Sequence, residues 1–203
     1  MTDSIRTHDP LEHWHRRLCP VTDWLLLSGD LHPQRRRAEA QVAKWCASGI
    51  TAIIDTRDEW TDEDLVAEIA PALRYWHLGT EDDGRRQNDA WFDAGVEAYR
   101  EAIADPSARL LVHCHMGINR GPSMGYRLLL EAGENPLTAL KVVRRARPIA
   151  AIAYAGDALD HFHRSSNASA RVRDRDVARL QEWMAANGID LDSLIRRTRA
   201  EVA

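Results

Sequence analysis

The chain has 203 residues, of which 44% are hydrophobic, so it can bury a sizeable core and we expect one globular domain with extensions. A formal net charge of -4 and a pI near 6.1 give no global reason to bind nucleic acid or acidic lipid. No apolar run is long enough to cross a bilayer, and the N-terminus is too charged for a signal peptide. The three cysteines form no CxxC pair, which argues against a disulfide scaffold or a cysteine-built zinc site. These features predict a cytoplasmic protein in a reducing compartment.

Strand and helix patterns alternate through the middle of the chain. In chain order, we expect a strand over 24–29, a helix over 33–49, a strand over 49–55, a helix over 61–73, a strand over 74–79, a helix over 89–104, a strand over 109–114 and helices over 121–133 and 135–148. Short buried strands that alternate with helices predict an α/β sheet.

The helices are predicted from apolar spacing and from their end residues. In the first helix, three apolar residues recur at helical spacing: Ala38, Val42 and Trp45. In the helix over 89–104, four apolar residues share one face: Phe92, Val96, Tyr99 and Ile103. Thr61 and Asn135 are expected to open their helices, and the helix after the last strand is expected to start near Pro122.

The C-terminal end differs in composition from the middle. Residues 164–170 (RSSNASA) are small and polar, and residues 172–202 have the periodicity of one or two helices, separated near Gly188. We interpret this region as a helical appendage. It is either a packing brace on the main domain or a surface for a dimer or another partner.

One cysteine stands at a chemically distinctive place, in RLLVHCHMGINRGPSM (109–124). A buried strand delivers Cys114, the following loop contains Gly117, and Arg120 precedes a helix. Backbone N–H groups of a tight loop, a helix N-terminus and a guanidinium together form a phosphate cradle. The same positive groups lower the pKa of a thiol from about 8.5, so we expect Cys114 to be a nucleophilic thiolate.

The segment VHCHMGINRG (112–121) resembles the HCxxGxxR signature of cysteine-dependent phosphatases, specifically the compact dual-specificity type of the protein tyrosine phosphatase family. Four further segments are similar to this family: WLLLSGDLHP, GITAIID, YWHLGTEDD and VVRRARP. The resemblance implies a central mixed, mainly parallel sheet flanked by helices. It covers about residues 21–165, which gives an N-terminal extension (1–20), a catalytic domain (21–165) and a C-terminal helical extension (166–203).

The resemblance also implies an activity. Cys114 would attack a phosphomonoester, Arg120 would bind the phosphate, and an upstream aspartate would act as general acid and then as base. Asp82 and Asp83 are both candidates, and the family spacing favours Asp82. The implied substrate-binding residues form the loop and its flanks: His113, His115, Met116, Gly117, Ile118, Asn119 and Arg120. His113 would orient the loop by hydrogen bonding. The implied substrates are phosphotyrosine or phosphoserine/threonine proteins, without a metal or another cofactor.

Two features depart from the family pattern. Gly121 follows the arginine where the family has serine or threonine, whose hydroxyl is thought to help the thiolate leave. Ser123 is expected to face elsewhere on the first helical turn, so hydrolysis of the phosphoenzyme should be slow. The segment PIAAIAYAGDAL (148–159) also lacks the polar PNxGF-like stretch of the family.

Other functions remain as alternatives. Asn119 matches the HCxxGxNR loop of RNA 5′-triphosphatases, and Arg85 and Arg86 beside the acid loop would meet extra phosphates, so an RNA 5′-phosphatase or triphosphatase is one alternative. The loop has no lysine, which disfavours a phosphoinositide substrate. A catalytically weak phosphate-binding module is the second alternative, but recognition alone needs no nucleophile.

A metal site is the third alternative, because histidines cluster in the sequence. The candidate ligands are HCH at 113–115 and the pairs His13/His15 and His161/His163. Adjacent strand residues point to opposite faces, so Cys114 cannot easily share a metal with both neighbours. We therefore expect no metal.

Overall fold

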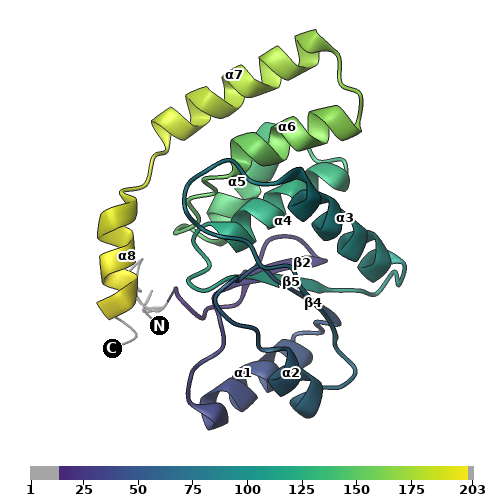
Figure 1. The fold of residues 1–203 in the computed structure, drawn as a ribbon, viewed down its shortest axis with the longest axis vertical. Helices are drawn as coiled ribbons and strands as arrows, with labels where there is room; N and C mark the ends of the chain where they lie inside the picture. Colours follow the sequence, from purple (N-terminus) through teal and green to yellow (C-terminus); the bar gives the residue numbers. More distant parts are fainter. Residues whose placement is uncertain (1–13, 201–203) are drawn as a thin grey trace, which may run out of the picture.

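The computed structural model describes residues 14–200. Over this range, one sheet lies between two layers of helices (Figure 1). The strands are β1 (Cys19–Pro20), β2 (Leu25–Ser28), β3 (Ala52–Asp55), β4 (Arg74–His77) and β5 (Leu110–His113). The helices are α1 (Arg35–Ala47), α2 (Glu63–Ile69), α3 (Asp89–Ile103), α4 (Arg120–Glu131), α5 (Pro136–Ala146), α6 (Ala155–Ser165), α7 (Ala170–Ala186) and α8 (Leu191–Ala200).

The strand order, β1-β2-β5-β3-β4, places β5 at the centre of the sheet. β1 pairs with β2 antiparallel and every other pair is parallel, which confirms the predicted mixed, mainly parallel sheet. His113, the last residue of β5, pairs with Ser28 on one side and with Asp55 on the other. The loop that begins at Cys114 therefore leaves the middle of the sheet at the carboxyl ends of its parallel strands, where α/β proteins bind ligands.

Both faces of the sheet are buried, which explains why the parallel strands are continuous apolar runs. α1 and α2 cover one face through buried side chains such as Val42, Trp45 and Val66. α3 to α6 cover the other face, which contains the larger core cluster (Figure 1). The expected apolar side chains of α1 are buried, and so are those of α3 except Ile103, which is 39% exposed at the last residue of the helix.

Some element boundaries differ from the prediction. α4 begins at Arg120, before Pro122, because the N–H of Ser123 already bonds to the carbonyl of Asn119. α2 begins at Glu63 with Asp62 as its N-cap, although the Thr61 hydroxyl does accept a bond from the N–H of Glu63. Two elements were not predicted, β1 and α6. β1 is a two-residue strand and has no sequence periodicity of its own.

The C-terminal extension divides into two helices, as expected. α7 packs along α5 and α6, whereas α8 lies apart from it, beside the loop that follows β5 (Figure 1). This packing agrees with the brace interpretation, and the partner-surface interpretation stays a prediction, as do the proposed domain limits. No helix within residues 14–200 is long and apolar enough to span a membrane.

Arg147, just after α5, joins the N-terminal segment to the loop after β5. Its side chain is fully buried and donates hydrogen bonds of 2.5 to 3.0 Å to five backbone carbonyls: those of Trp14, His15, Arg17, Met116 and Gly117. It also lies 3.4 Å from the sulfur of Cys19. One guanidinium therefore satisfies acceptors from two distant parts of the chain.

Replacing Arg147 with methionine should lower the free energy of unfolding by at least about 3 kcal/mol, because each buried carbonyl left without a donor costs about 1–3 kcal/mol. Urea unfolding followed by circular dichroism measures this change. Arg145→Met is the matched control, since Arg145 is exposed in the last turn of α5, two residues before Arg147, and the variant should stay within about 0.5 kcal/mol of the wild type. Equal stabilities of the two variants would contradict this role of Arg147.

Candidate active site

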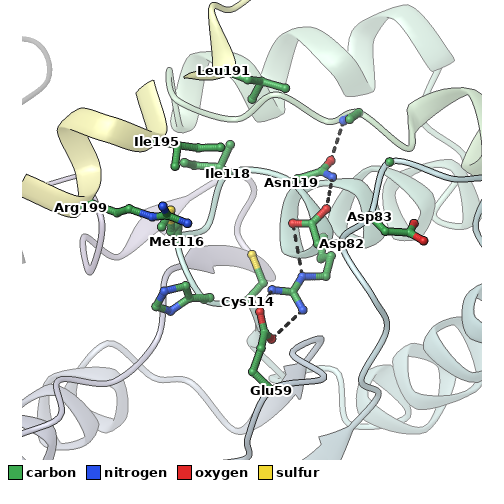
Figure 2. Close-up of a pocket in the computed structure, with 14 residues that line it drawn as sticks. Glu59, Asp82, Asp83, Cys114, Met116, Ile118, Asn119, Leu191, Ile195 and Arg199 are labelled. Atoms are coloured by element: carbon green, nitrogen blue, oxygen red, sulfur yellow. Dashed lines mark hydrogen bonds and ion pairs between the residues drawn. The ribbon is translucent and has the colours of Figure 1, made fainter. Parts of the chain in front are cut away.

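The loop between β5 and α4 forms the base of a cavity of about 470 Å³ (Figure 2). Cys114, at the start of this loop, is 2% exposed and lines the cavity. Gly117 has a φ of 64°, and a Cβ there would lie 2.3 Å from a nitrogen of Arg147, so only glycine fits this turn.

Hydrogen bonds from Arg147 set the orientation of two peptide groups in the loop. Because the carbonyls of Met116 and Gly117 point to its guanidinium, the N–H groups of the same trans peptides, on Gly117 and Ile118, point the opposite way. Neither N–H donates a hydrogen bond to any residue in the described range 14–200. This arrangement suits the binding of an oxyanion, as the glycine-bearing loop predicts.

Arg120, the first residue of α4, is held over the cavity by an acid that the sequence analysis missed. Its terminal nitrogens donate to both carboxylate oxygens of Glu59 at 2.7 and 2.8 Å, and one of them also bonds to the Thr80 carbonyl at 3.0 Å. These hydrogen bonds lower the pKa of Glu59 to about 2. Glu59 follows β3, so its position after a predicted parallel strand was the available signal.

Asp82 and Asp83 both line the cavity but differ in their contacts (Figure 2). Asp82 accepts hydrogen bonds from the Asn119 amide at 2.6 Å and from the Tyr154 hydroxyl at 2.9 Å, and its other oxygen lies 3.5 Å from Arg120 Nε. Asp83 instead bonds to the backbone and side chain of Arg85. Asp82 is therefore the carboxylate of the two that bonds to the loop that begins at Cys114.

Tyr154 belongs to the segment that departs from the family pattern. Burial, together with its bond to Asp82, raises the pKa of Tyr154 and keeps the hydroxyl available as a donor. Ser123 and Asn119 link the same segment to α4, because the Ser123 hydroxyl donates to Asn119 Oδ1 at 3.2 Å and accepts from the N–H of Tyr154 at 3.3 Å. These bonds occupy the hydroxyl of Ser123, which agrees with the expectation that it does not replace the one missing at Gly121.

Gly121 has a packing reason of its own. A Cβ at this position would lie 3.1 Å from the carbonyl carbon of His113 and 3.3 Å from the nitrogen of Cys114. Its φ lies outside the left-handed region. The glycine therefore lets the first turn of α4 rest directly against the end of β5.

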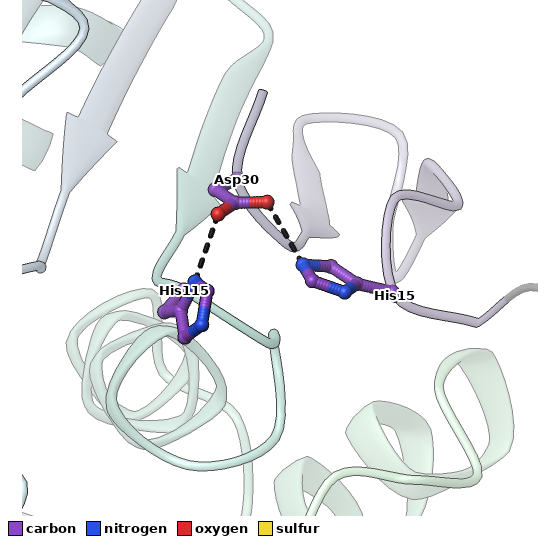
Figure 3. A group of neighbouring side chains, drawn as sticks. All are labelled: His15, Asp30 and His115. Carbon is purple, nitrogen blue, oxygen red and sulfur yellow. Dashed lines mark hydrogen bonds and ion pairs between the residues drawn. The ribbon is translucent and has the colours of Figure 1, made fainter. Parts of the chain in front are cut away.

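His115 is fixed from the N-terminal side (Figure 3). Asp30 hydrogen-bonds to His115 Nδ1 and to His15 Nε2, both at 2.8 Å, and Arg16 pairs with the same carboxylate at 2.9 Å. Burial by itself would raise the pKa of Asp30, but the two histidine bonds and the charge of Arg16 outweigh it and hold that pKa well below its usual range.

Among residues 14–200, most of the histidines that were considered as metal ligands have acidic partners. Possible ligand atoms of His15, Asp30 and His115 do come within 4.8 Å of one another, but Arg16 already supplies a cation to this carboxylate. His161 and His163 bond to different acids, Asp93 and Asp176. His13 lies outside the described residues.

The predicted substrate-binding residues divide into two groups. Those that line the cavity are His115, Met116, Ile118, Asn119 and Arg120. His113 and Gly117 lie behind it. His113 is fully buried, which lowers the pKa of its ring, and the ring nitrogens have no hydrogen-bond partner in the described part of the chain. Its predicted orienting hydrogen bond is thus absent from that part, and the backbone carbonyl of His113 bonds to Thr56 instead.

Neither a protein-family model nor a curated protein sequence matches the chain, but solved structures do. A variant of human DUSP28 is 20% identical with a TM-score of 0.59, and the match covers 75% of this chain and 98% of that one. PTPMT1 is 15% identical with a TM-score of 0.60, covering 76% and 99%. Tk-PTP in its active form is 16% identical with a TM-score of 0.57, covering 72% and 96%. These likenesses show that the chain has the fold that its resemblance to the dual-specificity phosphatases predicts.

Proposed function

We propose that the protein is a cysteine-dependent phosphatase that hydrolyses phosphomonoesters through a phosphocysteine intermediate. One observation supports this most directly: the sulfur-bearing Cys114, the guanidinium of Arg120 and the carboxylate of Asp82 line the same cavity at the carboxyl edge of a phosphatase-like sheet. A nucleophile, an anion clamp and a proton donor are the three groups that phosphoryl transfer to a thiolate needs.

The reaction would use these groups in two steps. In the first, the Cys114 thiolate attacks phosphorus, the bond to the ester oxygen breaks, and the protonated Asp82 gives its proton to that oxygen. In the second, Asp82 takes a proton from water as the water attacks phosphorus, and the bond to sulfur breaks to release inorganic phosphate and the thiolate. Arg120 would bind the phosphoryl oxygens in both steps, with Glu59 holding its fork in place.

Phosphorylated proteins, on tyrosine or on serine/threonine, are the substrates we propose. Another member of the fold, PTPMT1, has been solved in complex with PI(5)P, a phosphorylated lipid. The present loop contains no lysine, which disfavours such a headgroup. The RNA alternative loses support because Arg85 and Arg86 pair with Asp83 and Asp160, and neither arginine lines the cavity.

Cys114→Ser tests the nucleophile. The variant should lose at least about a thousandfold in the hydrolysis of 4-nitrophenyl phosphate, because a serine hydroxyl here has no base to activate it. It should still bind phosphate or vanadate, measured by calorimetry. Turnover close to wild type would refute the proposal. A wild-type protein that binds phosphate without turnover would support the phosphate-binding module instead.

Asp82→Asn and Asp83→Asn separate the two acid candidates. Loss of the general acid should lower the rate of hydrolysis about 10²–10⁴-fold for alkyl phosphates and much less for 4-nitrophenyl phosphate. It should also flatten the basic limb of the pH–rate profile. We expect this pattern from Asp82→Asn alone, since Asp83 bonds to Arg85. The same pattern from Asp83→Asn, with Asp82→Asn silent, would reverse the assignment.

Gly121 predicts a slow second step. Rapid mixing of the wild type with 4-nitrophenyl phosphate should release a burst of nitrophenol before a slower steady state, because no hydroxyl assists thiolate departure. Gly121→Ala and Gly121→Ser both crowd the end of β5, so comparing them isolates the hydroxyl. The serine variant should show the smaller burst of the two. A wild type without any burst would show that Gly121 is no handicap.

A further inference from the structure

The last helix of the described chain packs directly on the nucleophilic loop. Leu194 of α8 is 4% exposed and belongs to a buried cluster with Ile118, Ile149 and Ala151. Ile118 is itself a loop residue that lines the cavity. α8 is therefore fixed against the base of the site by an apolar contact, although residues 147–190 separate it from α5 along the chain (Figure 1).

One stripe of α8 reaches the cavity (Figure 2). Its members are spaced by four residues, which places them on a single face of the helix: Leu191, Ile195 and Arg199. Leu191 and Ile195 extend the apolar side chains of Met116 and Ile118 into one wall. This wall lies across the cavity from Asp82 and Asp83 (Figure 2).

The two arginines of the described chain that line the cavity differ in their partners. Arg120 is paired with Glu59 and lies beside Asp82. Arg199, by contrast, makes no hydrogen bond or ion pair with any residue between 14 and 200. It is thus a cation available to a ligand, on the same face of α8 as the two apolar side chains that line the cavity (Figure 2). A cavity of about 470 Å³ leaves room for more than a phosphoryl group.

We propose that α8 supplies a second substrate subsite, in which Leu191 and Ile195 line one side of an aromatic group and Arg199, on the same face of the helix, binds a carboxylate that this group carries. This inference deepens the proposed phosphatase function and rests on it. The substrate class is an aryl phosphate that carries a carboxylate, as a phosphotyrosyl peptide with an acidic neighbour does. A polyphosphate end would need several free cations, and Arg199 is the one lining cation left without a partner among the described residues.

Two substrates that differ by one carboxylate test the subsite: phenyl phosphate and 4-(carboxymethyl)phenyl phosphate. The quantity to measure is the ratio of their kcat/KM values. Arg199→Ala should lower the preference for the carboxylated substrate about fivefold, the upper range for a partly exposed ion pair. Arg199→Lys should retain most of the preference for the carboxylated substrate, and 0.5 M salt should reduce this preference in the wild type. Arg197→Ala, which removes an exposed arginine of α8 that does not line the cavity, should leave the ratio unchanged.

The outcomes distinguish this inference from the proposed function. If the wild type hydrolyses both substrates and Arg199→Ala leaves the ratio unchanged, the subsite is wrong and the phosphatase stands. If the wild type hydrolyses neither, the phosphatase proposal fails, and binding of the carboxylated substrate to Cys114→Ser with and without Arg199→Ala still measures the subsite. A preference for an RNA 5′-triphosphate over both aryl phosphates that depends on Arg199 would overturn the substrate class.

Discussion

The buried guanidinium of Arg147 is the constraint on which the candidate site depends. A cation in the interior needs oxygen partners, and here the partners are backbone carbonyls of the loop and of the N-terminal segment. By drawing the loop carbonyls inward, Arg147 directs the opposite ends of the same peptides away from itself. The orientation of these N–H groups, which suits an oxyanion, thus follows from a charge on the other side of the loop, and Gly117 is required because a side chain would occupy the space of Arg147.

The groups facing the cavity form two linked sets. Glu59 and the Thr80 carbonyl fix the Arg120 fork, so its orientation does not have to be acquired when a substrate binds. Asn119 and Tyr154 fix Asp82, and Asn119 belongs to the nucleophilic loop itself. Asp82 and the loop therefore share a hydrogen bond, which ties the position of the proposed proton donor to that of the proposed nucleophile.

The sequence predicted most where the physical signal is local. Apolar runs predicted the four main strands, Asn135 was correctly identified as a helix cap, and the CxxGxxR spacing predicts which strand end holds the candidate site. Tyr154 and Arg199 were missed because only tertiary packing brings Tyr154 to Asp82 and Arg199 to the cavity. The position of Glu59 after the predicted strand β3, by contrast, offered a signal that was not used. Tyr154 in particular lies in the segment that resembles the family least, so a pattern could not indicate its contact with Asp82.

Residues on both sides of the predicted catalytic segment, 21–165, contact the loop that follows β5 or hold its side chains in place. His15 and Asp30 hold His115 from the N-terminal side, while Leu194 packs on Ile118 from the C-terminal side. Between these contacts lies the loop that begins at Cys114. Two of its carbonyls bond to Arg147, and several residues of the loop line the cavity. Because the N–H groups of Gly117 and Ile118 have no partner among the described residues, the loop is stabilised by contacts with neighbouring elements, and these include α8. α8 therefore both packs on the loop, through Leu194, and lines the cavity, through Ile195 and Arg199. Changes in the packing of α8 should affect both the shape of the loop and the volume of the cavity.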